Sequence, residues 1–444
     1  MKYNLAQSIF WLVMFMALGL LPAAIGLAGE VPPAREFWVE FGVMTGFLGF
    51  AILNLQCVIT GRFNWFAAGF GFDNLLQFHK QTGIFALILV LVHPIVLFIA
   101  DPVFLEYFDL RVNAPRALAL SAITVSTVVV VATSLWRKTF GLSYEHWRLV
   151  HGVLSLGIIF LGLGHVLLVD HYNQPLWKKA VFVAMSGAAL YLVVHSRVVR
   201  PLLMRRRPYK AVEVRPEPND SWTLVIEPVG HEGMQHRAGQ FCWVTVGKSP
   251  FSMQQHPYSI VSSPLQKRLE LTIKEFGDFS KSVKHIAPET PIWLEGPYGC
   301  FFHEPHAVKG AVFVAGGVGI TPIMSMLRAA RDRGDRSPYM LFYGNTAWED
   351  VIFREEITEM TKRLKLKVVY ALTSPPDGWE GETGYIDKDV LERHFPKDVE
   401  NYAHFICGPA ALLDLVEPLL RSYGVPAASI HTERFDMVKT IFEP

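Results

Sequence analysis

The sequence predicts a mixed fold, in which a six-helix transmembrane bundle is followed by an antiparallel β-barrel and an α/β nucleotide-binding domain. Three observations lead to this prediction. Long apolar segments are concentrated before about residue 200. Short alternating runs typical of strands begin after Arg205-Arg206-Arg207. From about residue 304, strand and helix patterns alternate. We therefore expect domains at 1–204, 205–303 and 304–444.

The composition excludes several classes of protein. Apolar residues make up 51% of the 444 residues and charged residues only 18%, which is too apolar for an ordinary soluble enzyme. The formal net charge of +1 gives no reason to expect a nucleic-acid partner. The four cysteines form no CxxC pair, so neither a disulfide framework nor a zinc site is predicted.

Six segments are long and apolar enough to cross a bilayer. The first follows Lys2 and resembles a signal peptide, but its apolar run is longer than a typical signal core and five further spans follow. We therefore expect it to be a retained helix. The six predicted spans are 6–28, 37–60, 76–100, 116–136, 149–169 and 178–199.

Lysine and arginine in the loops predict the orientation, because positive charge accumulates on the cytosolic side. The 136–148 loop and the end of the sixth span are basic, whereas the 101–114 loop is mainly acidic. Both ends of the bundle are therefore expected in the cytosol. Lys178 and Lys179 lie on the wrong side for this rule.

Four histidines stand out within these spans. His79 and His93 are separated by 14 residues, and so are His151 and His165. Fourteen residues are close to four helical turns, so each pair lies on nearly one face, with Cα atoms ~21 Å apart along the axis. Two such helices facing each other would form two His–His pairs, one near each side of the membrane.

Imidazole is a natural axial ligand of haem iron, so we predict that His79, His93, His151 and His165 ligate two haems. The alternative, that they are hydrogen-bonded core residues, is less favoured because polar residues are costly within spans and two pairs share one spacing.

The predicted barrel contains two candidate flavin segments. In His256-Pro257-Tyr258-Ser259, the tyrosine offers a flat partner for an isoalloxazine ring and the serine a hydroxyl donor. Lys274 and the turn Gly277-Asp278-Phe279-Ser280 supply a cation, flexible backbone and a hydroxyl suited to a pyrophosphate. Each segment alone is a weak signal, because a Tyr-Ser dipeptide in a strand is usually only part of that strand.

A glycine turn marks the last predicted domain. The apolar strand Ala311–Ala315 leads into Gly316-Gly317-Val318-Gly319-Ile320-Thr321-Pro322 and then a helix, an arrangement that predicts a phosphate site. It is not the GxGxxG fingerprint, so a standard Rossmann dehydrogenase is not expected. Further strands are expected at 339–343, 367–372 and 404–406, the last ending in Cys407-Gly408-Pro409.

Two stretches in the spans resemble the ferric reductase and NADPH oxidase transmembrane superfamily, namely 71–80, which ends in Phe78-His79-Lys80, and 144–151, which contains Trp147-Arg148-Leu149-Val150-His151. The resemblance implies two b-type haems on the paired histidines. The order of His-Pro-Tyr-Ser, Gly296-Pro297-Tyr298-Gly299, the glycine turn and Cys-Gly-Pro is similar to the ferredoxin–NADP reductase module of that family.

The resemblance also implies roles for individual residues. Tyr258 and Ser259 would contact the isoalloxazine, with His256 where simpler reductases have arginine. Residues 316–322 would hold the nicotinamide dinucleotide, with Cys407 near the nicotinamide and Phe435 over the flavin. Three positions depart from the family: nine residues follow Phe435, Thr346 stands where arginine is frequent, and Leu97 stands where eukaryotic oxidases often have histidine. The choice between NADPH and NADH therefore stays open.

The expected function is electron transfer from cytosolic NAD(P)H through FAD and two haems to an extracytoplasmic acceptor, foremost O2, which gives superoxide. Alternatives are a ferric-chelate reductase, an electron-transfer subunit that feeds a quinone or a protein partner, and a membrane-anchored flavin reductase with structural histidines. The expected location is a bacterial inner (cell) membrane, with both termini and the FAD and NAD(P) domains cytoplasmic. No obligatory protein partner is expected.

Overall fold

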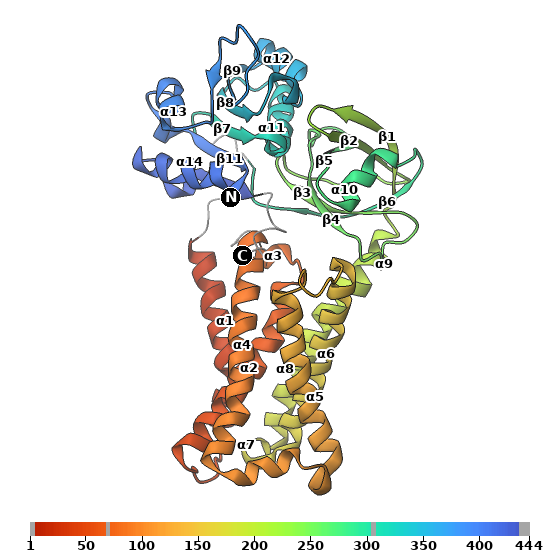
Figure 1. The fold of residues 1–444 in the computed structure, drawn as a ribbon, viewed down its shortest axis with the longest axis vertical. Helices are drawn as coiled ribbons and strands as arrows, with labels where there is room; N and C mark the ends of the chain where they lie inside the picture. Colours follow the sequence, from red (N-terminus) through yellow and green to blue (C-terminus); the bar gives the residue numbers. More distant parts are fainter. Residues whose placement is uncertain (1–4, 68–71, 303–307, 435–444) are drawn as a thin grey trace. The chain divides into compact units, whose positions relative to one another are not determined.

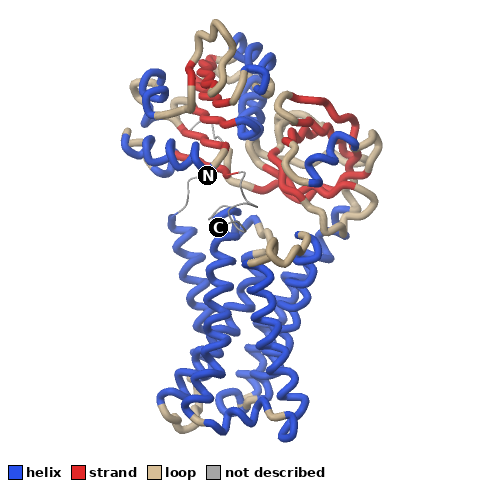
Figure 2. Tube along the Cα trace, viewed as in Figure 1, coloured by secondary structure: helices blue, strands red, loops and turns tan. Residues whose placement is uncertain are grey.

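The computed structural model describes residues 5–67, 72–302 and 308–434. The chain divides into two compact units near residue 200: the first ends at Val199 and the second begins at Arg200. Figure 1 shows the long helices of the first unit running side by side. Figure 2 shows that the strands belong to the second unit.

The first unit confirms the helical part of the predicted fold. Six helices in the described residues are long and apolar enough to cross a membrane, so the protein is an integral membrane protein. They are α1 (Leu5–Gly26), α2 (Phe37–Ile59), α4 (Phe72–Ala100), α5 (Leu110–Leu135), α6 (Tyr144–Leu168) and α8 (Leu176–Val194). The short elements are α3 (Asn64–Ala67), η1 (Pro102–Phe108), α7 (Asp170–Asn173) and the π-helical turn η2 (His195–Val199).

Side-chain caps explain where two of these helices begin. The Asp109 side chain accepts a hydrogen bond from the backbone N–H of Arg111 at 2.7 Å, so α5 starts six residues before the predicted 116. Its first turn contains Arg111 and Asn113 and is interrupted at Asn113, two residues before Pro115, so no continuous apolar pattern marked its start. Ser143 caps α6 in the same way, through the N–H of His146.

Lys178 is buried inside the first unit, with 1% of its surface exposed. Its ammonium donates to the carbonyl oxygen of Gly26 at 2.9 Å, at the end of α1, where helix carbonyls lack intrahelical partners. The side chain therefore caps a helix. This explains why Lys178 conflicts with an orientation rule that counts loop charges.

The second unit starts with α9 (Arg200–Met204) and a curled antiparallel sheet. Its six strands follow the order β4-β3-β6-β1-β2-β5, with a core that includes Leu224, Ile226 and Leu271. The strands are β1 (Tyr209–Glu217), β2 (Ser221–Pro228), β3 (Phe241–Val246), β4 (His256–Ser259), β5 (Leu269–Lys274) and β6 (Pro291–Tyr298). The short helices α10 (Asp278–Ser282) and η3 (Val283–His285) follow β5.

A parallel sheet follows, with the order β10-β9-β8-β7-β11-β12. Its strands are β7 (Ala311–Gly316), β8 (Pro338–Asn345), β9 (Lys365–Leu372), β10 (Glu382–Thr383), β11 (Ala403–Gly408) and β12 (Ile430–Arg434). The helices are α11 (Ile320–Arg333), α12 (Arg354–Arg363), α13 (Lys388–His394) and α14 (Ala410–Ser422), with single turns at 317–319, 348–350, 399–401 and 427–429. The predicted fold class is confirmed in all three parts.

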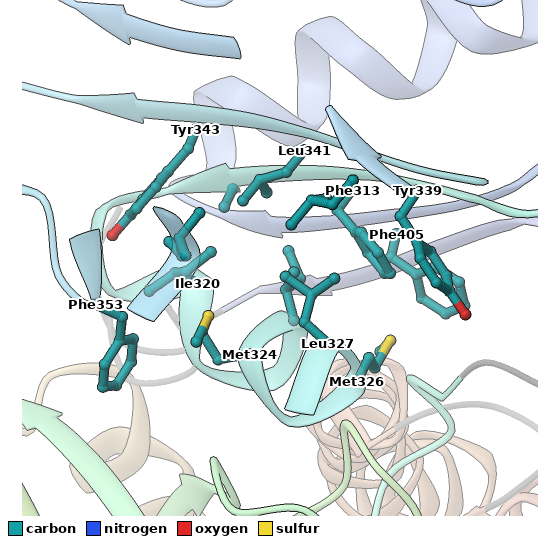
Figure 3. Packing of buried hydrophobic residues seen from close by; sticks show 14 of the residues in the cluster. Phe313, Ile320, Met324, Met326, Leu327, Tyr339, Leu341, Tyr343, Phe353 and Phe405 are labelled. Atoms are coloured by element: carbon teal, nitrogen blue, oxygen red, sulfur yellow. The ribbon is translucent and has the colours of Figure 1, made fainter. Parts of the chain in front are cut away.

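The core of the parallel-sheet domain positions the glycine turn. Figure 3 shows Phe313, Leu341 and Phe405 of the strands facing Ile320, Met324 and Leu327 of α11. Burial of this apolar face ties α11 to the sheet. The helix ends at Arg333 because Gly334 adopts a left-handed conformation, with φ +65°.

Candidate redox sites

The structure brings the four predicted histidines together as two pairs. His79 of α4 lies opposite His151 of α6, and His93 opposite His165, with ring centroids 6.2 Å apart in both cases. The two pairs come from the same two helices, as the shared spacing of 14 residues requires.

This separation suits a metal between the two rings. An imidazole nitrogen lies about 2 Å from a bound metal and about 1 Å from its own ring centroid, so a linear N–Fe–N arrangement separates the centroids by about 6 Å. The described residues contain no group of three or more histidine, cysteine or acidic side chains suited to a metal ion. Each pair therefore fits a metal whose remaining ligands come from a macrocycle such as haem.

Hydrogen bonds set the tautomer of two of the histidines. His93 Nδ1 lies 2.7 Å from the carbonyl oxygen of Gly42, which can only accept, so Nδ1 carries the proton. Ser134 donates its own hydroxyl proton to the Val130 carbonyl and so accepts from His151 Nδ1 at 3.2 Å. In both rings Nε2 keeps its lone pair for a metal, which is the form that haem iron needs.

Trp147 supports the His79–His151 pair from the helix that carries His151. Its ring lies 5.2 Å from that of His151, and its Nε1 donates to Ser134 Oγ at 3.3 Å. The roles of Ser134 and Gly42 were not found from sequence, because both contacts join different helices. The position of Trp147, four residues before His151, is the one local signal that was present.

Gly46 of α2 makes room for His93. A Cβ at this position would lie 2.7 Å from His93 Nδ1, closer than real Cβ contacts occur. We expect Gly46→Ala to displace the imidazole and weaken its bond to Gly42, with about a 10- to 100-fold loss of affinity for a haem between His93 and His165. Haem titration of the purified protein measures this change. Gly187→Ala, at an exposed position of α8 where a Cβ meets nothing within 4 Å, should titrate like the wild type. Equal losses in both variants would contradict the prediction.

The two predicted flavin segments come together in the antiparallel sheet. Phe279 of α10 stacks on His256 of β4, with centroids 4.0 Å apart and planes at 17°, and it also lies parallel to Tyr258 at 6.2 Å. Burial raises the pKa of the Tyr258 phenol, which therefore stays a neutral donor. Ser259 Oγ is buried and has no hydrogen-bond partner among the described residues, so it suits a polar ligand atom.

The remaining predicted flavin residues are partly engaged with the protein. Lys274 donates to the Asn219 side chain at 2.7 Å. Ser280 Oγ accepts from the N–H groups of Phe276 and Gly277, both at 2.8 Å, and so organises its own turn, which runs into α10 at Asp278. Their contact with a pyrophosphate stays a prediction.

The glycine turn lies against the end of β11. A Cβ on Gly319 would lie 2.2 Å from the Cys407 carbonyl oxygen, and Gly408 has φ +158° with its Cα next to Gly316. Thr321 donates to the Val318 carbonyl at 3.0 Å and closes the turn, and Pro409 packs on Gly316. The turn thus brings the carboxyl ends of β7 and β11 together, where ligands of such sheets bind.

Two predicted residues stand apart. The Cys407 side chain is fully buried in the core between the sheet and α11, so its contact with a nicotinamide stays a prediction. Phe435 lies outside the described residues.

Three consecutive segments of the chain match known families. Residues 45–162 match a model described as "Ferric reductase like transmembrane component", residues 210–301 an FAD-binding domain, and residues 313–417 an oxidoreductase NAD-binding domain. Together these models support the assignment of both halves and make FAD and NAD(P) binding a property of the second unit.

Individual relatives match the second half. The NADH-cytochrome b5 reductase 1 of Candida glabrata is 31% identical over 199 residues, or 44% of this chain and 70% of that protein. The Ferredoxin--NADP reductase B of Sorangium cellulosum is 30% identical over 248 residues, or 53% of this chain and 100% of its own length. Other reductases match over 54% to 63% of their length. A solved ferredoxin reductase in carbazole 1,9a-dioxygenase is 25% identical, with a TM-score of 0.45, over 52% of this chain and 69% of its own.

Proposed function

We propose that this chain, which belongs to the ferric reductase/NADPH oxidase-like family, transfers electrons from NAD(P)H to an acceptor across the membrane. That family joins a ferric reductase-like membrane component to a ferredoxin–NADP reductase-type module. FAD and two b-type haems would supply the redox chemistry, since a flavin links two-electron donors to one-electron carriers. The observation that supports this most is the pair of His–His sites with equal 6.2 Å separations.

The chain's own residues would do three things in this function. His79 and His151 would hold the inner haem, and His93 and His165 the outer one, oriented by Ser134 and Gly42. Tyr258 and Ser259 would bind the flavin ring beside His256 and Phe279. The turn from Gly316 to Pro322 would bind the nicotinamide dinucleotide.

We propose O2 as the acceptor, with superoxide as the product. A ferric-chelate reductase is the second candidate, and one residue favours it. Leu97, four residues after His93, is buried and packs toward Gly42, so this position offers no hydrogen-bond donor to an oxygen species. A quinone or protein partner as acceptor is the third candidate. The FAD and NAD(P) domains are proposed to lie in the cytoplasm of a bacterial cell, where NAD(P)H is available.

An anaerobic stopped-flow experiment on the purified protein tests this proposal. NADPH or NADH, added with excess FAD, should produce the bands of reduced b-type haem. A pulse of air should then reoxidise the haems and form a product sensitive to superoxide dismutase. Slow reoxidation in air with fast reoxidation by ferric citrate would replace O2 by a ferric chelate. Absence of haem bands would leave a membrane-anchored flavin reductase.

A further inference from the structure

Arg328 is a buried cation in the third turn of α11, with 8% of its side chain exposed. Its guanidinium forms a fork with Glu356, through Nε at 2.9 Å and Nη2 at 2.6 Å. Its third nitrogen, Nη1, donates to Glu270 at 2.7 Å and to the Val261 carbonyl oxygen at 3.4 Å. Arg328 therefore joins the parallel-sheet domain to the antiparallel-sheet domain within one compact unit.

The contacts of Arg328 lie close to both candidate binding segments, the flavin segment in β4 and the glycine turn before α11. Val261 lies two residues after Ser259, and its N–H donates to the Glu270 carbonyl at 2.8 Å. On the other side, Arg328 lies seven residues after Thr321, on the helix that begins at the glycine turn. Ser325, one turn earlier on α11, donates to the Ser262 carbonyl at 2.9 Å. Two side chains of α11 therefore link the helix that follows the glycine turn to the segment that follows β4.

The charges in this contact are fully paired. Glu270 also binds Arg215 at 2.7 Å, and Glu356 also binds Arg331 at 3.1 Å. Burial alone would raise the pKa of Glu270, but the Arg328 and Arg215 guanidiniums lower it, so the carboxylate stays charged. The Phe353 ring lies 5.2 Å from the Arg328 guanidinium, and Phe353 has a left-handed backbone, with φ +60°, that non-glycine residues rarely adopt.

Stability alone explains such a network poorly. Buried ion pairs add little to stability compared with apolar residues of the same size, because desolvation of the charges offsets their attraction. A planar guanidinium that binds two carboxylates does, however, define distance and angle. The network therefore restricts geometry between two domains that must bring a nicotinamide and a flavin together.

We propose that Arg328 is a positioning residue that sets the approach of the nicotinamide to the flavin, and so the rate of flavin reduction. This inference rests on the proposed function. The step concerned is NAD(P)H + FAD + H⁺ → NAD(P)⁺ + FADH₂, and Arg328 takes no part in its bonds. Hydride transfer is sensitive to misplacement of about 1 Å, which costs about 100-fold in rate.

The test is anaerobic stopped-flow reduction of FAD in the full-length protein, with excess FAD and increasing NAD(P)H. For Arg328→Met we expect the limiting rate of flavin reduction to fall about 10- to 100-fold, while the half-saturating NAD(P)H concentration changes less than about threefold. Arg328→Lys keeps the charge without the fork and should lie between Arg328→Met and the wild type. Glu270→Gln, which removes the partner charge, should lower the same rate.

Arg331→Met is the matched control, because Arg331 lies on the same helix and binds Glu356, while its ion-pair partners, Asp332 and Glu356, both belong to the parallel-sheet domain. It should keep the wild-type rate. Unchanged limiting rates in Arg328→Met and Glu270→Gln would overturn the proposal, as would equal losses in Arg331→Met. If Arg328→Met does not fold, the Arg328→Lys and Glu270→Gln variants decide. Failure of NAD(P)H to reduce the wild-type flavin would instead reject the proposed function.

Discussion

Replacing His93 by alanine is expected to lower the haem content from about two to about one per chain, while the rate at which NAD(P)H reduces FAD stays within about twofold of the wild type. The reason is that His93 belongs to one pair only, with His165, and the other pair retains both imidazoles. A haem between these two helices would then be held by His165 alone and would lose one of its two protein ligands. His165→Ala should have the same effect.

The haem-to-protein ratio and the reduced-minus-oxidised spectrum measure this result. His146→Ala is the control, since His146 is an exposed histidine on α6, the helix that carries His165. It should retain about two haems. Two intact haems in both His93→Ala and His165→Ala would contradict the ligand assignment. A loss of flavin reduction in these variants would contradict the independence of the two halves.

Gly319→Ala is expected to produce the opposite phenotype. Its Cβ would lie 2.2 Å from the Cys407 carbonyl oxygen. Both atoms are attached directly to the backbone, so no side-chain rotation relieves this clash and the turn has to move by about 1 Å. We expect flavin reduction by NAD(P)H to fall about 100-fold. Haem content and the reduction of haem by dithionite should not change, because the histidine pairs belong to the other unit.

Stopped-flow flavin reduction, together with haem reduction by dithionite, checks this result. Arg333→Ala, at the exposed far end of the same helix, should behave like the wild type. A Gly319→Ala variant with wild-type flavin reduction would remove the turn from the nucleotide site. Loss of haem in this variant would indicate general misfolding instead of a local change.

The boundaries of the elements were predicted well where the pattern is local. The second span was expected at 37–60 and α2 covers Phe37–Ile59, because its apolar residues are continuous. The prediction was wrong at the start of α5, where the Asp109 cap begins the helix before its continuous apolar run. It was also incomplete at Ser280, which was expected in a simple turn and instead caps a short helix.

The candidate sites show the same difference between features set by local patterns and features set by long-range contacts. Spacing alone predicted that His79 and His93 share one face of a helix, because helical geometry is the same in every sequence. It could not predict Gly42 as the acceptor for His93, since that contact spans 51 residues. Nor did it predict that the Cys407 side chain would be buried, because the direction of a strand's side chains depends on which face its neighbours cover.

The sequence by itself determined the six apolar spans, the equal spacing of the histidines and the glycine turn after β7, because these features depend on periodicity and on the conformational freedom of single residues. Only the tertiary structure decided which nitrogen of His151 carries a proton, why Gly46 is small, and how Arg328 joins two domains. These properties arise from contacts between segments far apart in the chain. Such contacts depend on the register in which helices and strands pack, and no local pattern of residues specifies that register.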